Sequence, residues 1–278
     1  MVDRWILTRF TATVLEVNKA LENFDLGQAG SLIYEFIWNE FCDWYIELAK
    51  GRLYAKDNHR ARYTAQVVLH AVLKGTMELL HPFMPFITEE IYQHLPGTKG
   101  TVMLSRFPRG VELGAEFAAA EQNMGLIMEV IKGIRNIRAE MNVPLGKKAD
   151  VILVANSPST QSVIEEGQQF IKQLASAAEL TIHLQLDEKP EQAGTAIVGM
   201  VEVYVPLAGA IDLDKEIARL EKELDSMQKE IQRAESKLNN QGFVAKAPAE
   251  VIDKEREKLT GFIAKRQALE ERIEGLKK

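Results

Sequence analysis

Apolar side chains recur at alternating spacings of four and three residues toward the end of the chain, and this heptad pattern restricts the fold more than any other feature. One run contains Leu213, Ile217, Leu220, Leu224, Met227, Ile231, Ala234 and Leu238, and a second contains Ile252, Leu259, Phe262, Leu269, Ile273 and Leu276. Such spacing predicts two helices packed through one apolar seam. Because residues 239–248 allow only a short connection, we expect an antiparallel coiled-coil hairpin with arms of about 40 Å, at about 1.5 Å per residue.

Two charged residues, Glu255 and Arg266, fall on seam positions of this hairpin. The alkyl stem of Arg266 can pack in the seam while its guanidinium reaches outward, in the direction of Glu223 on the other arm. A hairpin buries its own seam and leaves no apolar stripe for a second copy. We therefore expect a monomer.

The first half of the chain shows helical periodicity in four segments. Apolar residues recur at helical spacing over residues 3–22, 27–54, 60–80 and 115–142. The second segment has an apolar face wide enough for packing on more than one side. These segments predict a helical bundle.

The segment from Leu79 to Tyr92 predicts a helix-helix corner rich in apolar residues. Pro82 disfavours helical geometry at His81, so the preceding helix is expected to end there. Thr88 is a candidate cap for the next helix, and Glu89 and Glu90 are expected near its positive end. The physical pattern favours a packed turn over a chemical role for His81.

The apolar pattern changes after Lys148 from helical periodicity to runs typical of strands. A β-branched run predicts a strand over residues 149–155, followed by a helix over 157–178 and strands over 180–186 and 196–207. A further short extended piece is expected at Val102 to Phe107. The predicted fold is mainly α, with a helical bundle (1–148), a small α/β module (149–210) and a coiled-coil arm (211–278).

Composition excludes several classes of protein. There is one cysteine, Cys42, which permits neither a disulfide framework nor a cysteine-based zinc site and favours the reducing cytoplasm. We expect no signal peptide, no membrane span and no metal site. No pairing of a nucleophile with a base and no phosphate-binding glycine loop is visible, so we expect no catalytic residue. With 34 basic and 40 acidic residues the net charge is −6, and any contact with RNA must be local.

Two windows carry an excess of positive charge. The first contains Lys50, Arg52, Lys56, Arg60 and Arg62, and the second is a helical strip with Lys132, Arg135 and Arg138 followed by Lys147 and Lys148. A solvated helix face is an equally good interpretation of the strip from spacing alone.

Several local sequences resemble one family. Asp43-Trp44-Tyr45, the corner from His81 to Tyr92, the run from Ile134 to Glu140 and the hairpin tip with Asn239 to Phe243 are similar to the carboxy-terminal part of bacterial valine-tRNA ligases. The corner alone is similar to several class I synthetases, and the terminal hairpin singles out the valine enzymes. Nothing resembles the HIGH or KMSKS motifs or an editing domain.

The resemblance implies a function for each region. In this family the bundle binds the anticodon stem and loop of tRNA, and the terminal coiled coil contacts the outer corner of the same tRNA. It implies tRNA(Val) as partner, with no DNA and no membrane. The sites for ATP, Mg and valine would lie in a missing amino-terminal part, so the chain would be an inactive fragment of a cytoplasmic ligase.

The basic residues supply the candidate RNA contacts that the resemblance implies. On the anticodon side these are Lys50, Arg52, Arg60, Arg62, Lys132, Arg135 and Arg138, and on the arm they are Lys229, Arg233, Lys237, Lys246, Lys254 and Lys258. Phosphates require such cations. The alternative is a self-standing helical and coiled-coil interaction protein without an RNA ligand.

Overall fold

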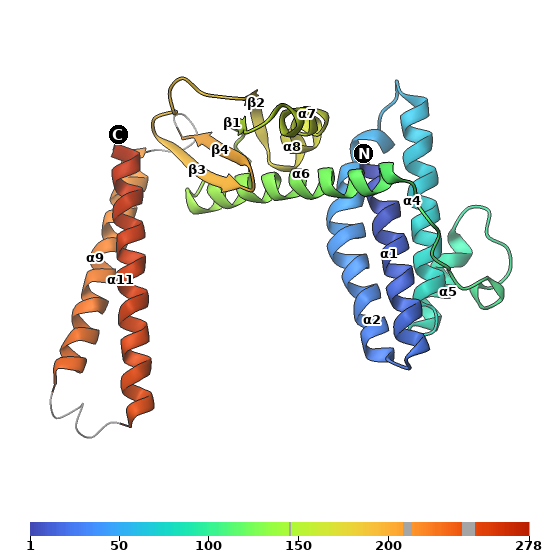
Figure 1. Cartoon of the computed structure of the whole chain (residues 1–278), viewed down its shortest axis with the longest axis horizontal. Helices are drawn as coiled ribbons and strands as arrows, with labels where there is room; N and C mark the ends of the chain where they lie inside the picture. Colours follow the sequence, from blue (N-terminus) through green and yellow to red (C-terminus); the bar gives the residue numbers. More distant parts are fainter. Residues whose placement is uncertain (145, 208–212, 241–247, 278) are drawn as a thin grey trace. The chain divides into compact units, whose positions relative to one another are not determined.

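The computed structural model describes residues 1–144, 146–207, 213–240 and 248–277, and the chain divides into two compact units, residues 1–129 and 130–278 (Figure 1). The boundary falls inside one long helix, α6 (Ala115–Glu140). The fold is mainly α with one small sheet, as the sequence predicts. In the described part of the chain, no helix is both long enough and apolar enough to span a membrane. The three-part division of the sequence stays a prediction.

The first unit is a bundle of helices. Its elements are α1 (Val2–Glu22), α2 (Leu26–Glu35), the π-helix η1 (Phe36–Ile46), α3 (Glu47–Leu53), α4 (His59–Leu80), α5 (Pro85–His94), the 3-10 helix η2 (Val102–Leu104) and the first part of α6. One buried cluster joins α1, α2 and α4 through Val14, Val17, Ala20, Ala29, Ile33 and Leu79. Burial of these apolar faces stabilises the bundle.

Arg9 of α1 links three elements of this unit. Its guanidinium donates two hydrogen bonds to the Glu40 carboxylate, both 2.8 Å long, and a third of 2.9 Å to Glu121 in α6. These bonds raise the pKa of Arg9 above its ordinary value, although burial opposes the shift. A bidentate pair of this kind fixes both distance and direction.

The predicted helix over 27–54 is continuous, but its centre is a π-helix. Aromatic rings dominate this stretch: Phe36 and Phe41 have ring centroids 6.4 Å apart, and Phe41 and Tyr45 have centroids 6.0 Å apart. Phe36 and Phe41 are five residues apart, and the wider turn of a π-helix, with its i→i+5 hydrogen bonds, brings residues at this spacing toward one side of the helix. Phe41 and Tyr45 are four residues apart, a spacing that is also close in an α-helix.

The corner between α4 and α5 differs from the prediction in its cap. Helix α4 ends at Leu80 with His81 as C-cap, as expected, but α5 begins at Pro85. Proline fixes a helical φ at this position and has no N–H to satisfy. Thr88 is therefore already inside the helix, where its hydroxyl donates to the Met84 carbonyl at 2.8 Å and lies 2.7 Å from His81 Nδ1.

Glu89 also has a role that the sequence did not indicate. Its carboxylate accepts hydrogen bonds from the Thr101 hydroxyl at 2.8 Å and the Val102 amide at 3.0 Å. These bonds, with that from Thr101 the largest cause, hold the pKa of Glu89 below its ordinary value. The carboxylate thus holds the start of η2, and the extended piece predicted over Val102 to Phe107 is wrong for its first three residues.

The sheet of the second unit has four strands in the order β2-β1-β4-β3. Its strands are β1 (Ala149–Ala155), β2 (Ala177–His183), β3 (Ala193–Val198) and β4 (Val201–Pro206), of which β1 and β2 are parallel and the other pairs antiparallel. Helices α7 (Pro158–Glu166) and α8 (Gln168–Leu174) connect β1 to β2. A connection between parallel strands requires such a crossover.

Three predictions for this sheet are wrong in detail. The helix expected over 157–178 is broken at Gly167 and ends at Leu174, the strand expected over 180–186 lies three residues earlier as β2, and the single strand expected over 196–207 is a hairpin of β3 and β4. Gly199 and Met200 form the two-residue turn of this hairpin, and Gly199 has a positive φ of 55°. Positive φ at such a turn favours glycine. The apolar residues on both sides concealed the turn.

The second part of α6 packs closely against β3. A Cβ atom added to Gly194 would lie 2.3 Å from Cγ2 of Ile137, and one added to Gly133 would lie 2.7 Å from Cγ2 of Val198. The register pairs Gly194 with Val205, so the close contact lies on the sheet face that carries Val205. Glycine at both positions lets the helix and the strand approach without a clash.

Helices α9 (Leu213–Asn239) and α11 (Ala249–Lys277) lie side by side (Figure 1). Lys277 near the end of α11 pairs with Glu221 near the start of α9 at 2.8 Å, and Lys237 near the end of α9 pairs with Glu255 near the start of α11 at 3.6 Å. These pairs make the helices antiparallel, as predicted. Leu220, Ile231, Ala234, Ile273 and Leu276 are the buried seam residues.

The prediction that Arg266 reaches toward Glu223 is wrong. Its Nε lies 3.5 Å from Glu270 on the same helix, whereas Glu223 pairs with Arg219 at 3.1 Å. Both pairs span one helical turn, a spacing at which opposite charges meet without reaching across the hairpin.

A charge placed in the seam tests the intramolecular hairpin. We expect Ile231→Asp to destabilise the α9–α11 hairpin by about 2 to 4 kcal/mol, because Ile231 is buried and a carboxylate there lacks a partner. Circular dichroism during urea unfolding measures the effect. Gln232→Asp is the matched control, because the neighbouring side chain is exposed and its change should have little effect. Light scattering should show the same mass for both variants; a dimer that dissociates in Ile231→Asp would contradict the hairpin.

Candidate nucleic-acid interface

Lys50 and Arg52 lie at the end of α3, and both are already paired with carboxylates. Lys50 contacts Glu47 at 2.5 Å, with both side chains more than two-fifths exposed. The Arg52 guanidinium donates to both oxygens of Asp3, at 2.5 Å and 2.7 Å, and the pair is largely buried. Arg52 therefore presents little uncompensated charge to an RNA.

Asp3, Arg52 and Tyr45 form one hydrogen-bonded group. The Tyr45 hydroxyl donates to Asp3 at 3.0 Å. Burial alone would raise the pKa of the Asp3 carboxyl, but hydrogen bonds and charge from Arg52 outweigh it and lower that pKa. Burial, followed by the neighbouring Asp3 charge, raises the pKa of the Tyr45 phenol. The group joins α1, η1 and α3 and serves the fold.

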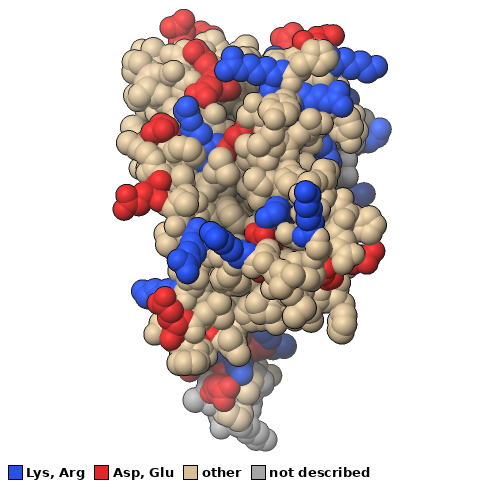
Figure 2. All heavy atoms as spheres, turned by 90° about the vertical axis from the view of Figure 1, so that its right-hand side faces the viewer, with Lys and Arg blue, Asp and Glu red and all other residues tan. Residues whose placement is uncertain are grey.

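Arg60 and Arg62 lie in the first turn of α4, which Asn58 caps by accepting the Ala61 amide at 3.0 Å. Both side chains are exposed, and neither has an ion-pair partner within the described residues. Figure 2 shows Lys and Arg side chains gathered at the upper end of this face, where the connection between α3 and α4 lies in Figure 1. Among the predicted anticodon-side cations, these two are exposed and have no carboxylate partner in the described part of the chain.

Two exposed tyrosines accompany these arginines, and sequence reasoning missed them. Tyr54 follows α3 and is 79% exposed, and Tyr63 is on the first turns of α4 and is 68% exposed. Unstacked RNA bases bind to aromatic faces of this kind. The available signal was one aromatic residue inside the basic window, Tyr54, and one directly after it, Tyr63; without burial data, each is equally well read as a core residue.

The strip on α6 separates into different environments. Lys132 and Arg135 are exposed, and Arg135 donates through Nε to the Leu174 carbonyl at 2.8 Å. The Arg135 guanidinium thus holds the end of α8.

The prediction that Arg138 contacts RNA is wrong, because Arg138 is buried. Its side chain donates to the carbonyl oxygens of Lys147 at 2.6 Å and Ser176 at 3.3 Å, and the residue is only 6% exposed. Burial lowers the pKa of its guanidinium. Arg138 therefore connects the end of α6 to the strands that follow, and a phosphate has no access to it.

The arm residues are exposed but paired. Within the described residues, Lys229 pairs with Asp225, Arg233 with Glu230 and Lys254 with Glu250, each one helical turn away, and all three cations are more than three-fifths exposed. Exposed pairs of this spacing contribute little to stability and dissociate easily. Lys246 lies outside the described residues.

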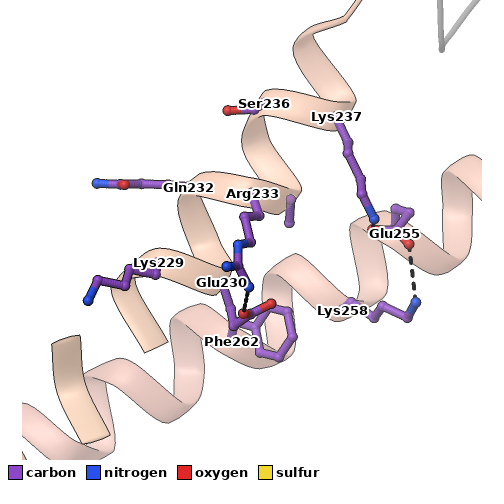
Figure 3. A pocket seen from close by; sticks show the side chains of 10 residues that line it. Lys229, Glu230, Gln232, Arg233, Ser236, Lys237, Glu255, Lys258 and Phe262 are labelled. Carbon is purple, nitrogen blue, oxygen red and sulfur yellow. Dashed lines mark hydrogen bonds and ion pairs between the residues drawn. The ribbon is translucent and has the colours of Figure 1, made fainter. Parts of the chain in front are cut away.

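Four of the predicted cations line one groove near the end of the arm. The open groove, about 860 Å³ in volume, lies between α9 and α11 and is lined by Lys229, Arg233, Lys237, Lys258 and the ring of Phe262 among others. In Figure 3, Arg233 and Lys237 extend toward α11, whereas Lys229 and Gln232 point away from it. The structure thus brings most of the arm candidates together.

Glu255 holds two of these lysines at the centre of the groove. Its carboxylate lies 3.1 Å from Lys258 and 3.6 Å from Lys237, and its side chain is 14% exposed (Figure 3). The hydrogen bond from Lys258, with the charge of Lys237, lowers the pKa of the Glu255 carboxyl. The acidic seam residue that broke the heptad pattern therefore positions cations from both helices.

Two family profiles match this chain. A family profile described as the anticodon-binding domain of tRNA ligase matches residues 3–153, and a profile described as the valyl tRNA synthetase tRNA binding arm matches residues 212–277. The first match covers more than half of the chain.

Similar proteins cover the whole chain. Valine–tRNA ligase of Carboxydothermus hydrogenoformans is 48% identical over 273 residues, and those of Bacillus subtilis (strain 168) and Syntrophotalea carbinolica are 42% and 44% identical over 277 and 278 residues. These alignments include 98% to 100% of this chain but only 30% or 31% of the relatives. The chain therefore spans less than a third of the length of the relatives it matches.

Replacing Asp3 tests whether its pairing with Arg52 is structural. We expect Asp3→Asn to lower the free energy of unfolding by about 2 kcal/mol at neutral pH, because Arg52 loses its charged partner. The native pKa of Asp3 is depressed, so the stabilisation is present above its unfolded value of about 3.9 and is lost as pH falls through the native pKa. Urea unfolding at neutral pH and at about pH 3 measures this loss.

The surface pair Glu47 and Lys50 provides the control. Glu47→Gln should change the free energy of unfolding by less than about 1 kcal/mol, because both side chains are well exposed. Equal effects of the two substitutions at neutral pH would contradict a structural role specific to Asp3.

Proposed function

The chain belongs to the family of anticodon-binding domains of tRNA ligases, and from this premise we propose that it is the tRNA-binding portion of a valine–tRNA ligase. The match of the arm profile and the identity to valine–tRNA ligases support the choice of tRNA(Val) as the RNA. In this function the chain binds the RNA and holds it for a reaction performed elsewhere in the enzyme.

The observation that carries the proposal is the distribution of accessible cations on an acidic chain. The chain has a net charge of −6, yet Arg60 and Arg62 are exposed together and four arm cations line one groove. Binding of a phosphate to a lysine or arginine releases counterions, which supplies affinity without a net positive protein. Local clusters of this kind suit an RNA that is contacted at a few defined places.

On the anticodon side, we assign phosphate contacts to Arg60 and Arg62 and stacking to Tyr54 and Tyr63. The two arginines extend from a capped helix start, which limits their freedom before binding. The two tyrosines offer exposed rings to bases of an anticodon loop. Lys50, in the same unit, can add a phosphate contact to this set. Lys132 and Arg135 belong to the second unit and are separate candidates for phosphate contacts, whereas Arg52 and Arg138 act through the fold.

On the arm, RNA phosphates compete with carboxylates for the same cations. Lys237 and Lys258 are held by Glu255, and Arg233 is held by Glu230. A phosphate that enters the groove replaces one ion pair with another, so the gain is small for each contact and several contacts are required. Lys229, paired with Asp225, lines the same groove, and Lys254, paired with Glu250, is a further exposed cation of the arm outside it.

We assign the catalytic steps of the reaction to the part of the related ligases that does not align with this chain. Activation of valine by ATP with Mg, and its transfer to tRNA, are assigned to the rest of the ligase, which accounts for over two thirds of the relatives' length. We assign the protein to the cytoplasm and expect a monomer that binds neither DNA nor a membrane.

The isolated chain is expected to lack aminoacylation activity. Valine-dependent exchange of pyrophosphate into ATP should not exceed the rate without enzyme, because nothing in the sequence resembles the HIGH or KMSKS motifs. Charging of tRNA(Val) should likewise be absent. The complete Bacillus subtilis enzyme serves as a positive control. Exchange that depends on valine and on this chain would contradict the proposal.

Removing charge from each region should affect a different part of the RNA footprint. Arg60→Gln with Arg62→Gln should weaken tRNA(Val) binding by about tenfold and remove backbone protection of the anticodon region. Arg233→Gln with Lys237→Gln should remove protection of the outer corner instead. Gel shifts at several salt concentrations and hydroxyl-radical footprints measure both effects.

A control on the same helix distinguishes the effect of cations in the groove from the effect of removing positive charge in general. Arg219→Gln with Lys222→Gln removes the same charge from α9 outside the groove, and it should change affinity by less than about threefold. If the arm variant keeps full affinity and full protection, the arm does not bind this RNA. Absence of any binding to tRNA would favour the alternative of an interaction protein.

A further inference from the structure

The connection between η2 and α6 carries a second pocket, about 700 Å³ in volume, that contains none of the predicted RNA contacts. Asn18, Arg106, Phe107, Pro108 and Arg109 line it. The lining therefore offers two guanidinium groups, one phenyl ring and one amide, and it includes no carboxylate. In this respect it differs from the arm groove, whose lining includes Glu230 and Glu255.

The backbone of this connection is held against α1 at three places. The Asn18 amide donates to the Pro108 carbonyl at 3.1 Å and to the Val14 carbonyl at 2.7 Å. Phe107 packs against the buried cluster of α1, α2 and α4. A Cβ atom added to Gly110 would lie 2.3 Å from Cδ2 of Leu15, so the chain approaches α1 more closely than another residue allows.

These contacts fix the attachment points of both arginines before a ligand binds. Arg106 and Arg109 flank the anchored segment Phe107-Pro108, so their Cα positions are set by the bundle core. Ordering a binding loop in advance reduces the conformational entropy lost on binding. The pair therefore differs from two arginines on a free loop.

Both guanidinium groups are available for a ligand. Arg106 and Arg109 are exposed, and in the part of the chain that the structure describes neither is bonded to a carboxylate. By contrast, Arg9 and Arg52 of the same unit each hold a carboxylate through two hydrogen bonds. An anion at Arg106 and Arg109 does not have to displace an internal partner.

We propose that Arg106 and Arg109 form an additional binding site for the sugar–phosphate backbone of the tRNA. Guanidinium groups match phosphate oxygens through paired N–H donors, and arginine is preferred over lysine for such geometry. Phe107 lines the same pocket and offers an apolar surface to a ribose, while the Asn18 amide holds Pro108 in place. The inference rests on the proposed tRNA-binding function and adds a contact on the first unit separate from the anticodon set of Arg60 and Arg62.

A neutral variant of the complete chain tests the site. Arg106→Gln with Arg109→Gln should weaken binding of tRNA(Val) by about tenfold at moderate salt. The slope of log affinity against log salt concentration should become shallower by about 1 to 2, since each lost phosphate contact contributes about 0.7 to 0.9. Hydroxyl-radical footprinting should show loss of backbone protection at positions that Arg60→Gln with Arg62→Gln leaves protected.

Two matched variants make the result specific. Lys172→Gln with Lys189→Gln removes the same charge from the α/β module and should change affinity by less than about twofold and leave the footprint intact. Arg106→Lys with Arg109→Lys keeps the charge and should recover the salt slope but only part of the affinity. Thermal unfolding monitors whether each variant is folded.

The possible outcomes separate this inference from the proposed function. If the wild-type chain binds tRNA(Val) and the neutral arginine variant binds with the same affinity, salt slope and footprint, the additional site is refuted and the proposed function stands. If the wild-type chain binds no tRNA, the proposed function fails and this inference fails with it. A footprint lost only at the anticodon region would also refute a separate site.

Discussion

Burial of one apolar stripe along α6 is the constraint on which both compact units depend, because the boundary between them falls inside this helix. Met124 and Ile127 are buried in the part that belongs to the bundle, and Ile131, Ile134 and Ile137 are buried in the part that belongs to the sheet unit. In the sheet unit the stripe reaches the strands only because Gly133 and Gly194 remove side chains from the contact. A larger residue at Gly194 would meet Ile137 and push the helix from the sheet.

The same helix determines which of its cations remain for an RNA. Residues 132, 135 and 138 lie along one strip, but the end of α6 is covered by the connection to β1 and by the start of β2, so Arg138 is drawn into backbone hydrogen bonds. A guanidinium supplies five donors, which makes it able to satisfy several carbonyls where chain ends converge. Arg138 therefore fits neither interpretation of the strip, and the choice between a solvated face and a binding surface concerns Lys132 and Arg135 alone.

Features set by a period in the sequence were predictable, and features set by distant contacts were not. The prediction of α4 differs from the structure by one residue at its start, and that of α6 by two at its end, because burial of one face imposes a helical period. The burial of Arg138 arises from the carbonyl groups of Lys147 and Ser176, which lie outside its helix. The π-helix and the β3–β4 turn are local, but the apolar residues around each of them concealed it. For the candidate site, the position of basic residues was readable, but their carboxylate partners were not, except where Glu255 interrupted the seam. The exposed Tyr54 and Tyr63 and the pocket at Arg106 and Arg109 gave no periodic signal.

Pairing of cations with nearby carboxylates has a consequence for how such a chain selects an RNA. An isolated phosphate gains little at Lys237 or Lys258, because it must compete with Glu255 for them, and a random anionic polymer is also repelled by the net charge of the chain. Contacts made at separate regions by one ligand reinforce each other through a raised local concentration, whereas contacts by separate ligands do not. An acidic chain with a few accessible or exchangeable cations therefore favours a folded RNA that presents phosphates at several matching places at once. Adding positive charge elsewhere would strengthen binding to every RNA and reduce this preference.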